Sequence, residues 1–165
     1  MSTPSYQNIP PRMRERKAWL NWQQQSRPGS TKPTKVPYIA GTNINASSTN
    51  ADTWRSYMVA EAAMKTGRYD GIGFALDGSD LVALDLDDVR DPATGYIAPW
   101  GSAVVRKVAS YVEVSPSGRG LRIIVRGQLP PDSKHKVEFS DGSKLEAWDS
   151  ERYITMTGDL VSGWP

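Results

Sequence analysis

The stretch Leu84-Asp85-Leu86-Asp87 alternates apolar and acidic residues at the end of a short apolar run. Residues i and i+2 of a β-strand point to the same face, about 6.6 Å apart along the chain. The alternation therefore predicts Asp85 and Asp87 on one face, with the leucines turned to helices on the other. Two carboxylates so placed can hold divalent ions. The alternative is a strand that runs into an acidic surface turn.

Further short apolar runs follow the same pattern. The runs 71–76 and 81–87, separated by the turn 77–80, predict an antiparallel hairpin. We expect the strands 112–114 and 121–125 to flank the loop 115–120, and the strands 145–148 and 153–157 to form a last pair. Such hairpins with intervening helices predict an α+β domain, with one sheet and helices on one face.

The N-terminal part has fewer clear signals. Residues 1–11 hold three prolines and little apolar content, which predicts a flexible arm. We expect a strand over 18–22, and a loop or edge strand over 26–37. Helices are expected from an Asp52 or Thr53 N-cap through Lys65, closed by Gly67, and over 100–111.

Composition limits the classes of function. A chain of 165 residues suits one compact domain, and the absence of cysteine excludes disulfides and thiolate chemistry. No apolar run approaches the roughly 20 residues that span a bilayer, so we expect no membrane partner and a cytoplasmic location. Residues 1–50 hold seven Lys and Arg against one acid, which predicts a polyanion track beside an acidic cluster. The alternative is a surface that averages to neutral.

Two further segments can place charges beside the aspartates. Leu145 and Ala147 take the core face of their strand, so Glu146 is predicted on the opposite face, where it would complete a set of oxygen ligands for Mg²⁺ or Mn²⁺. Arg122 is predicted on the carboxylate face of its own strand. The loop Ser115–Gly120 can offer backbone N–H groups to phosphate, or it is simply a flexible hairpin loop.

The order of these motifs resembles the archaeo-eukaryotic primase superfamily, in particular its phage, prophage and plasmid primase-polymerase branch. The resemblance covers most of residues 15–160. It is carried by Gly71–Phe74, Leu84–Asp87, Ser115–Arg122, Leu145–Trp148 and Tyr153–Gly158, with Lys35–Tyr38 and Thr53-Trp54 upstream.

The resemblance implies a catalytic sheet of RNA-recognition-motif type, with helices on one face, over 71–160 of a catalytic domain spanning 12–165. A small N-terminal α/β lobe would occupy 12–70. The metal ligands and catalytic residues would be Asp85, Asp87 and Glu146. The motif that commonly supplies a phosphate-binding histidine falls on Arg122, which can bind phosphate but cannot exchange a proton near neutral pH.

The remaining site residues are predicted in two groups. Nucleotide contacts are expected from Arg122, Ser115, Ser117, Gly118, Lys35 and Thr157. Nucleic-acid contacts are expected from Arg119, Lys134, His135 and Lys136. A lone histidine in a basic run is otherwise simply solvated.

The sequence thus favours template-directed nucleotidyl transfer, by a DNA primase or polymerase acting in phage, prophage or plasmid replication. The partners would be a single-stranded DNA template or primer, nucleoside triphosphates, and a helicase domain or partner of the full-length protein. Two alternatives are a catalytically inert nucleic-acid-binding module of the same fold and a metal-dependent nuclease. The nuclease fits less well, because no lysine follows Glu146 closely.

Overall fold

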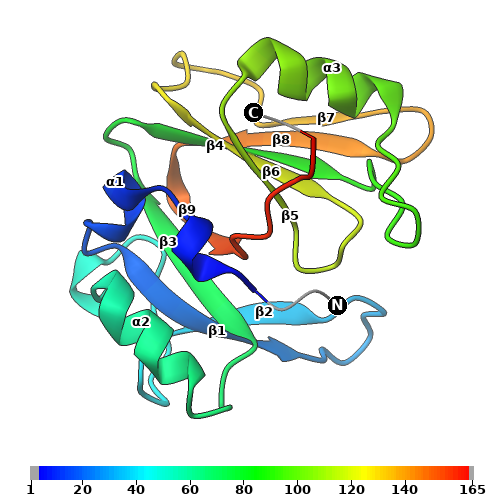
Figure 1. Ribbon diagram of the computed structural model, residues 1–165. Coiled ribbons are helices and arrows are strands. Elements are labelled where there is room, and N and C mark those ends of the chain that lie inside the picture. The colour runs from blue at the N-terminus through cyan, green and yellow to red at the C-terminus, as the bar shows by residue number, and fades with distance from the viewer. Residues whose placement is uncertain (1–3, 164–165) are drawn as a thin grey trace.

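The chain forms two antiparallel sheets. A computed structural model describes residues 4–163 (Figure 1). A four-stranded sheet has the order β2-β1-β3-β9, and a five-stranded sheet has the order β5-β6-β4-β8-β7. The strands are β1 (Trp19–Gln25), β2 (Thr34–Tyr38), β3 (Gly71–Asp77), β4 (Leu81–Asp87), β5 (Tyr111–Val114), β6 (Leu121–Arg126), β7 (Lys136–Glu138), β8 (Lys144–Trp148) and β9 (Ser150–Met156).

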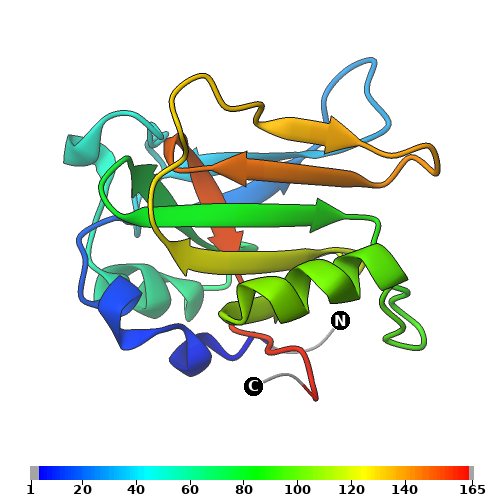
Figure 2. The same cartoon turned by 90° about the horizontal axis from the view of Figure 1, so that it is seen from above.

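Helices cover the outer faces of both sheets. Figure 1 shows α3 (Pro99–Val108) above the five-stranded sheet and α2 (Tyr57–Met64) below the four-stranded one. In Figure 2 the strands of the five-stranded sheet lie side by side, and α3 runs along the β5–β6 side. The short elements are η1 (Tyr6–Asn8), α1 (Pro11–Arg14) and η2 (Ala51–Thr53). The prediction of an α+β chain is confirmed, but the prediction of a single sheet is wrong.

Two of the three predicted strand pairs are wrong. Strand β3 pairs with β1 and β9, whereas β4 pairs with β6 and β8. The turn after β3 therefore carries the chain from one sheet to the other, and the turn between β8 and β9 carries it back. The Gly78 N–H donates to the Asp149 carbonyl oxygen at 2.8 Å, which ties the two crossovers together. The pair β5–β6 is confirmed.

These crossovers also bear on the expected boundary at residue 70. Strands β3 and β9 both come from the region expected to form the catalytic sheet, yet they join β1 and β2. Strand β3 is buried at every position except its last. A strand that is buried on both faces has a continuous apolar sequence, and that sequence does not indicate which strands it pairs with.

One hydrophobic cluster fills the space around the four-stranded sheet and reaches the five-stranded sheet. It contains Trp19, Phe74 and Ile154 together with Ala83 and Ile124. A second cluster lies between the five-stranded sheet and α3, and Leu86, Val105 and Ile123 belong to it. Because Ala83 and Leu86 fall in different clusters, the predicted alternation along β4 is confirmed.

The N-terminal segment differs from the prediction of a loose arm. Residues 1–3 lie outside the described part of the chain, but Tyr6 and Ile9 are buried in the first cluster. The Ser5 N–H donates to the Thr157 carbonyl oxygen at 3.0 Å. The segment packs against the core because its apolar side chains reach it. Its prolines lie at a turn and at the start of a short helix.

The predicted helices are shorter than expected. Helix α2 begins at Tyr57, and its N-cap is Ser56, whose hydroxyl accepts from Val59 N, so the prediction of Asp52 or Thr53 as cap is wrong. Asn50 instead caps η2. Helix α3 ends at Val108, because Ala109 adopts a left-handed conformation. Among residues 4–163, no helix combines the length and apolar character needed to cross a bilayer.

Candidate active site

A row of charged residues crosses the five-stranded sheet on the face turned toward the other sheet. Asp85 lies opposite Arg122 on β6 and opposite Glu146 on β8. The row continues to Glu113 on β5, opposite Arg122, and to Lys136 on β7, opposite Glu146. Cross-strand partners on one face have Cβ atoms about 4.5–5.5 Å apart. Register thus brings together Asp85, Glu146 and Arg122, which the sequence predicts on one face.

Arg122 holds Asp85 at the centre of this row. Its Nη2 lies 2.9 Å from both carboxylate oxygens of Asp85, and its Nη1 donates to the hydroxyl and carbonyl oxygens of Thr155. The guanidinium is buried, yet the Asp85 and Glu113 carboxylates raise the pKa of Arg122. Arg122 thus lies on the predicted face, but both its terminal nitrogens are engaged by the protein rather than free for a triphosphate.

Glu113 lies behind Arg122 and is fully buried. Its carboxylate accepts from the Tyr111 hydroxyl at 2.6 Å and from the N–H groups of Thr157 and Gly158 at 3.0 and 2.9 Å. Burial raises the pKa of Glu113, whereas the Tyr111 hydroxyl, the Arg122 charge and these N–H groups act in the opposite direction. The buried positive charge of Arg122 therefore has a carboxylate on each side.

Glu146 is held from three directions at the β8 end of the row. The Trp148 indole Nε1 donates to its Oε2 at 3.1 Å. Lys136 Nζ lies 3.8 Å from Oε1, and Arg152 Nη1 lies 3.9 Å from Oε2. These cations balance the Glu146 charge in the structure.

Asp87 follows Asp85 on the same face and is half-buried. Its side chain makes no hydrogen bond or ion pair with the described residues. Burial raises the pKa of Asp87, and the charges of Asp85 and Glu146 raise it further. The negative charges of Asp85 and Glu146 therefore add to burial in disfavouring the ionised form of Asp87.

The charged row opens into a cavity of about 230 Å³ between the two sheets. It is lined by Lys35, Ala83, Asp85, Arg122, Glu146, Trp148, Arg152, Tyr153, Ile154 and Thr155. Lys35 reaches it from β2, with its Nζ 5.6 Å from the centre of the Trp22 ring. Burial lowers the pKa of Lys35, as does the nearby Arg122 charge, while Asp85 and Asp87 act in the opposite direction.

Two glycines of β3 leave room for the rings on the four-stranded side of this cavity. A Cβ at Gly71 would stand 2.6 Å from the Trp22 ring, and one at Gly73 would stand 2.7 Å from the Tyr153 ring. Real Cβ atoms do not approach so closely, so any larger residue would displace a ring. The Tyr153 hydroxyl donates to the Lys35 carbonyl oxygen, which joins the β2 and β9 walls.

The Ser115–Gly120 loop joins β5 to the start of β6, just before Arg122, but none of its residues lines the cavity. The N–H groups of Gly118, Arg119 and Gly120 donate to Ser115 O, Ser117 Oγ and Ser115 Oγ. These donors stabilise the loop itself, so the structure does not offer them to a phosphate. Phosphate binding by Ser115, Ser117 and Gly118 stays a prediction.

The other predicted contact residues are scattered. Arg119 forms an exposed ion pair with Asp88 at 3.0 Å. Thr157 donates its hydroxyl to the Val114 carbonyl oxygen and lies outside the cavity lining. Lys134 and His135 are exposed just before β7, beside Lys136. Only Lys35 and Arg122, of the predicted nucleotide contacts, line the cavity.

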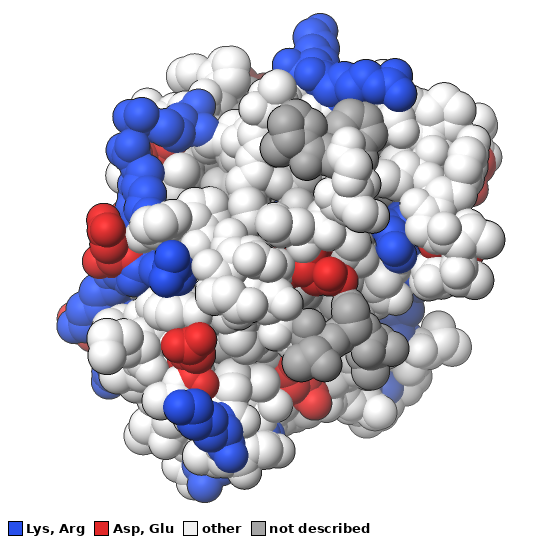
Figure 3. Space-filling view, in the orientation of Figure 1, with Lys and Arg blue, Asp and Glu red and all other residues white. Residues whose placement is uncertain are grey.

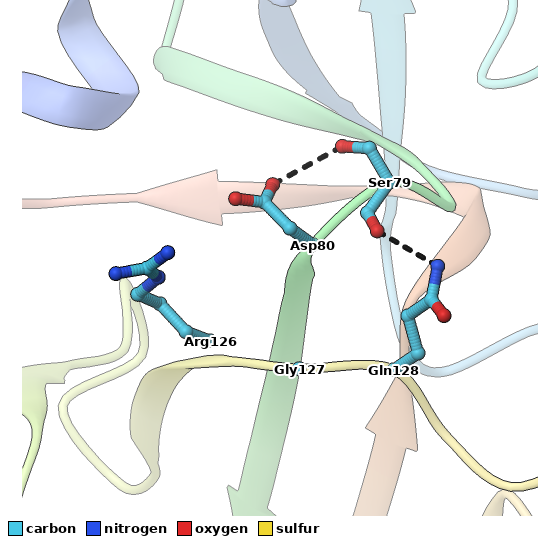
Figure 4. Close-up of a pocket in the computed structure, with 5 residues that line it drawn as sticks. All are labelled: Ser79, Asp80, Arg126, Gly127 and Gln128. Atoms are coloured by element: carbon cyan, nitrogen blue, oxygen red, sulfur yellow. Dashed lines mark hydrogen bonds between the residues drawn. The ribbon is translucent and has the colours of Figure 1, made fainter.

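A second, more open hollow of about 550 Å³ lies at the start of β4, away from the charged row. Figure 4 shows Arg126 extending beside Asp80, and Ser79 joined by hydrogen bonds to Asp80 and to Gln128. Asp80 also pairs with Arg12 and Arg16. Figure 3 shows Lys and Arg gathered at the left-hand edge, beside α1 and the β3–β4 turn of Figure 1. This surface is basic but lacks the grouped carboxylates of the cavity.

Several residues at the site carry no sequence signal that predicts their role. Glu113 is a single acid between two valines, and its position behind Arg122 depends on the β5–β6 register. Trp148, Arg152 and Tyr153 line the cavity because the chain crosses between sheets after β8. The alternation within β9 indicates that Tyr153 and Thr155 share a face, but not that this face meets β4.

A cationic cleft between two antiparallel sheets, with carboxylates on one wall, has the donors that phosphoryl-transfer sites use. Over 146 residues, 88% of its length, the chain is 38% identical to a DNA primase-polymerase of Nitratiruptor phage NrS-1. The chain spans only 20% of that protein's length. No protein-family model matches the chain.

Proposed function

We propose that the chain is the nucleotidyl-transfer unit of a primase-polymerase of the archaeo-eukaryotic superfamily, which extends DNA on a single-stranded template. The observation that carries the proposal is the placement of Asp85 directly opposite Glu146, with Asp87 next on the same face. The similarity to a phage DNA primase-polymerase supports the same reading. Nucleoside triphosphates and a template or primer strand would be the substrates.

The five-stranded sheet supports an RNA-recognition-motif type of catalytic sheet. Strands β4, β5, β6 and β8 take the spatial order β5-β6-β4-β8, and α3 connects β4 to β5. Both features belong to the ferredoxin-like arrangement of that motif. A longer protein with a helicase unit, acting in the cytoplasm of a host cell, completes the proposal.

The carboxylates fit a divalent cation in their chemistry. Mg²⁺ and Mn²⁺ prefer oxygen donors, and Asp85, Asp87 and Glu146 would supply them. Burial raises the pKa of Asp87 most, and the Asp85 and Glu146 charges, which a cation would neutralise, raise it further. Within residues 4–163, no three His, Cys, Asp or Glu side chains are already arranged to hold a metal ion. Asp85 and Glu146 are instead turned to Arg122 and Arg152.

When bound, the metal ion would supply charge stabilisation on the triphosphate and activation of a 3′-hydroxyl. The residues of the chain supply orientation. Arg122 fixes the Asp85 carboxylate through one nitrogen, which leaves further lone pairs of that carboxylate free. Lys35 places a positive charge in the cavity, where a triphosphate oxygen can accept a hydrogen bond from it.

Primer extension on a single-stranded template, with Mg²⁺ or Mn²⁺ and labelled nucleotides, tests the proposal. We expect incorporation by the wild type, and losses of at least about a hundredfold in Asp85→Asn and Glu146→Gln. Asp141→Asn, in the β7–β8 turn, is the control and should keep wild-type synthesis. Normal extension by Asp85→Asn would remove the carboxylates from the reaction.

The second candidate is a nucleic-acid-binding module of the same fold without efficient chemistry. The engagement of Arg122 by Asp85 and Thr155 favours it, because no free arginine replaces the missing histidine at that position. Tight binding of single-stranded DNA without any extension in either metal would select this candidate.

A further inference from the structure

We propose that the outer face of the His135 ring binds a base of single-stranded nucleic acid by stacking. His135 is the end of a three-layer stack that continues through Trp148 to Arg152. The inference rests on the proposed function only for the choice of single-stranded nucleic acid as the partner. The binding itself requires neither metal nor chemistry.

The stack is nearly parallel and closely spaced. The His135 and Trp148 ring centroids lie 4.3 Å apart, with an angle of 5° between the planes. Arg152 Cζ lies 3.7 Å from the centre of the Trp148 ring. Two groups this close to one ring would collide on the same face, so His135 and Arg152 cover opposite faces of Trp148.

Each layer is held in place by a separate contact. The Trp148 Nε1 donates to Glu146, and Arg152 lies near the same carboxylate. His135 Nδ1 lies 2.9 Å from the Ala147 carbonyl oxygen. A carbonyl only accepts, so the proton is assigned to Nδ1, and the ring orientation is fixed. A base that stacks on a ring already fixed in this way costs little side-chain entropy.

Only the His135 end of the stack offers an uncovered aromatic face. Trp148 is covered on both faces, and the other end of the stack is the half-exposed guanidinium of Arg152, which is not an aromatic ring and lines the cavity between the sheets. His135 is exposed and precedes β7, which is the edge strand of its sheet. Every residue of β7 is exposed. Exposed aromatic and arginine planes are the surfaces on which proteins stack unpaired bases.

The flanking charges fit the backbone of the same ligand. Lys134 and Lys136 stand on either side of His135 in the chain and both are exposed, with Lys136 also 3.8 Å from Glu146. Alternation of a stacking ring with cations is typical of sequence-tolerant single-strand binding. Trp148 contacts both His135 and Glu146. A nucleic-acid strand bound on His135 would therefore lie beside the charged row.

The test compares two ligands that differ only in their bases. A labelled deoxythymidine oligonucleotide and an abasic oligonucleotide of equal length are titrated with the full chain in EDTA, with fluorescence anisotropy as the readout. We expect His135→Ala to weaken thymidine-strand binding roughly five- to hundredfold and to leave abasic binding unchanged. His135→Tyr, which keeps a ring, should restore the affinity to within about twofold.

Lys134→Ala is the matched control, because it removes a charge and no ring. It should weaken the binding of both oligonucleotides equally. The slope of log binding constant against log salt concentration should become shallower by about 0.7. Equal weakening of both ligands by His135→Ala would overturn the proposal in favour of a phosphate contact. Unchanged binding of both by His135→Ala would also overturn it. Base-dependent binding by a protein that extends no primer would support this inference while refuting the proposed chemistry.

Discussion

Asp85 and Arg122 face each other across β4 and β6, and one guanidinium nitrogen lies 2.9 Å from both carboxylate oxygens. The arginine side chain is 7% exposed and the aspartate side chain 27%. A buried ion pair gains little unless its remaining donors are also satisfied. Thr155 meets that condition for Nη1, and Glu113 adds negative charge nearby, but the buried Arg122 Nε has no hydrogen-bond partner among residues 4–163.

This pair couples the two sheets. Asp85 and Arg122 belong to the five-stranded sheet, whereas Thr155 lies on β9 of the other sheet. The orientation of a proposed catalytic carboxylate therefore depends on how β9 packs. Arg122 acts as a positioning residue in this arrangement.

Replacement of Arg122 by Met should lower the free energy of unfolding by about 3–5 kcal/mol, because it leaves the Asp85 and Glu113 charges without their buried partner. Urea denaturation at pH 7 measures the change. Arg119→Met, which breaks the exposed pair with Asp88, is the control and should cost less than about 1 kcal/mol. Equal losses in the two variants would show that the buried pair is not specially stabilising.

Glu113 should make stability depend on pH. Its carboxyl pKa is raised in the folded protein by burial, so the folded state binds the proton more tightly than the unfolded state does. This contribution to stability is present below the unfolded pKa of about 4.3 and is lost as pH rises through the folded value. The free energy of unfolding of wild type minus that of Glu113→Gln should therefore fall as pH rises from about 4 to 7.

Urea unfolding of both proteins at several pH values measures this difference. Glu138→Gln, at an exposed position of β7, should show a nearly constant difference. A difference that grows with pH for Glu113→Gln would mean that Arg122 and the three hydrogen-bond donors outweigh burial.

The alternation within single strands could be predicted from the sequence. Leu84, Leu86 and Leu145 pack toward α3, which leaves Asp85 and Glu146 on the other face as predicted. That prediction succeeds because side chains of a strand alternate with period 2 whatever the strand pairs with. The α+β class follows from the same local patterns.

The pairing of strands far apart in the chain could not be predicted in this way. Gly78 lies in the turn after β3 and Asp149 in the turn between β8 and β9; both turns resemble hairpin turns, yet both connect different sheets. The roles of Thr155 and Glu113 depend on these long-range pairings. The sequence therefore predicts Arg122 as a phosphate ligand, because the residues that engage it lie on strands whose positions no local pattern specifies.

Lys35 should contribute to nucleotide binding rather than to the fold. Lys35→Met removes the ammonium from the cavity and should raise the KM for nucleotide about 10- to 100-fold, since hydrogen bonds to charged groups contribute about 1.5–3 kcal/mol. Steady-state primer extension with varied nucleotide concentration measures it. Lys32→Met, in the exposed loop before β2, should change the KM less than about twofold. An unchanged KM in Lys35→Met would remove Lys35 from the nucleotide site.

Asp87 should show opposite effects on stability and activity. Two carboxylates about 6.6 Å apart repel by roughly 2.5 kcal/mol at an effective dielectric constant of 20, and solvent screening reduces this to the order of 1 kcal/mol. Asp87→Asn removes that repulsion and should raise the free energy of unfolding in EDTA by about 1 kcal/mol. The same change should reduce primer extension by at least about a hundredfold, because it removes a proposed metal ligand.

Asp88→Asn is the neighbouring control for this prediction. Asp88 has a positive φ of 55°, a conformation that Asn also tolerates, and its side chain is exposed beside Arg119. Stability and extension should both stay near wild type, within about 0.5 kcal/mol for unfolding. Asp87 would then destabilise the metal-free protein and still be required for its reaction. Such a combination is expected at a site selected for function. If Asp87→Asn were stabilised and still extended primers normally, the repulsion would be real, but Asp87 would have no part in the reaction.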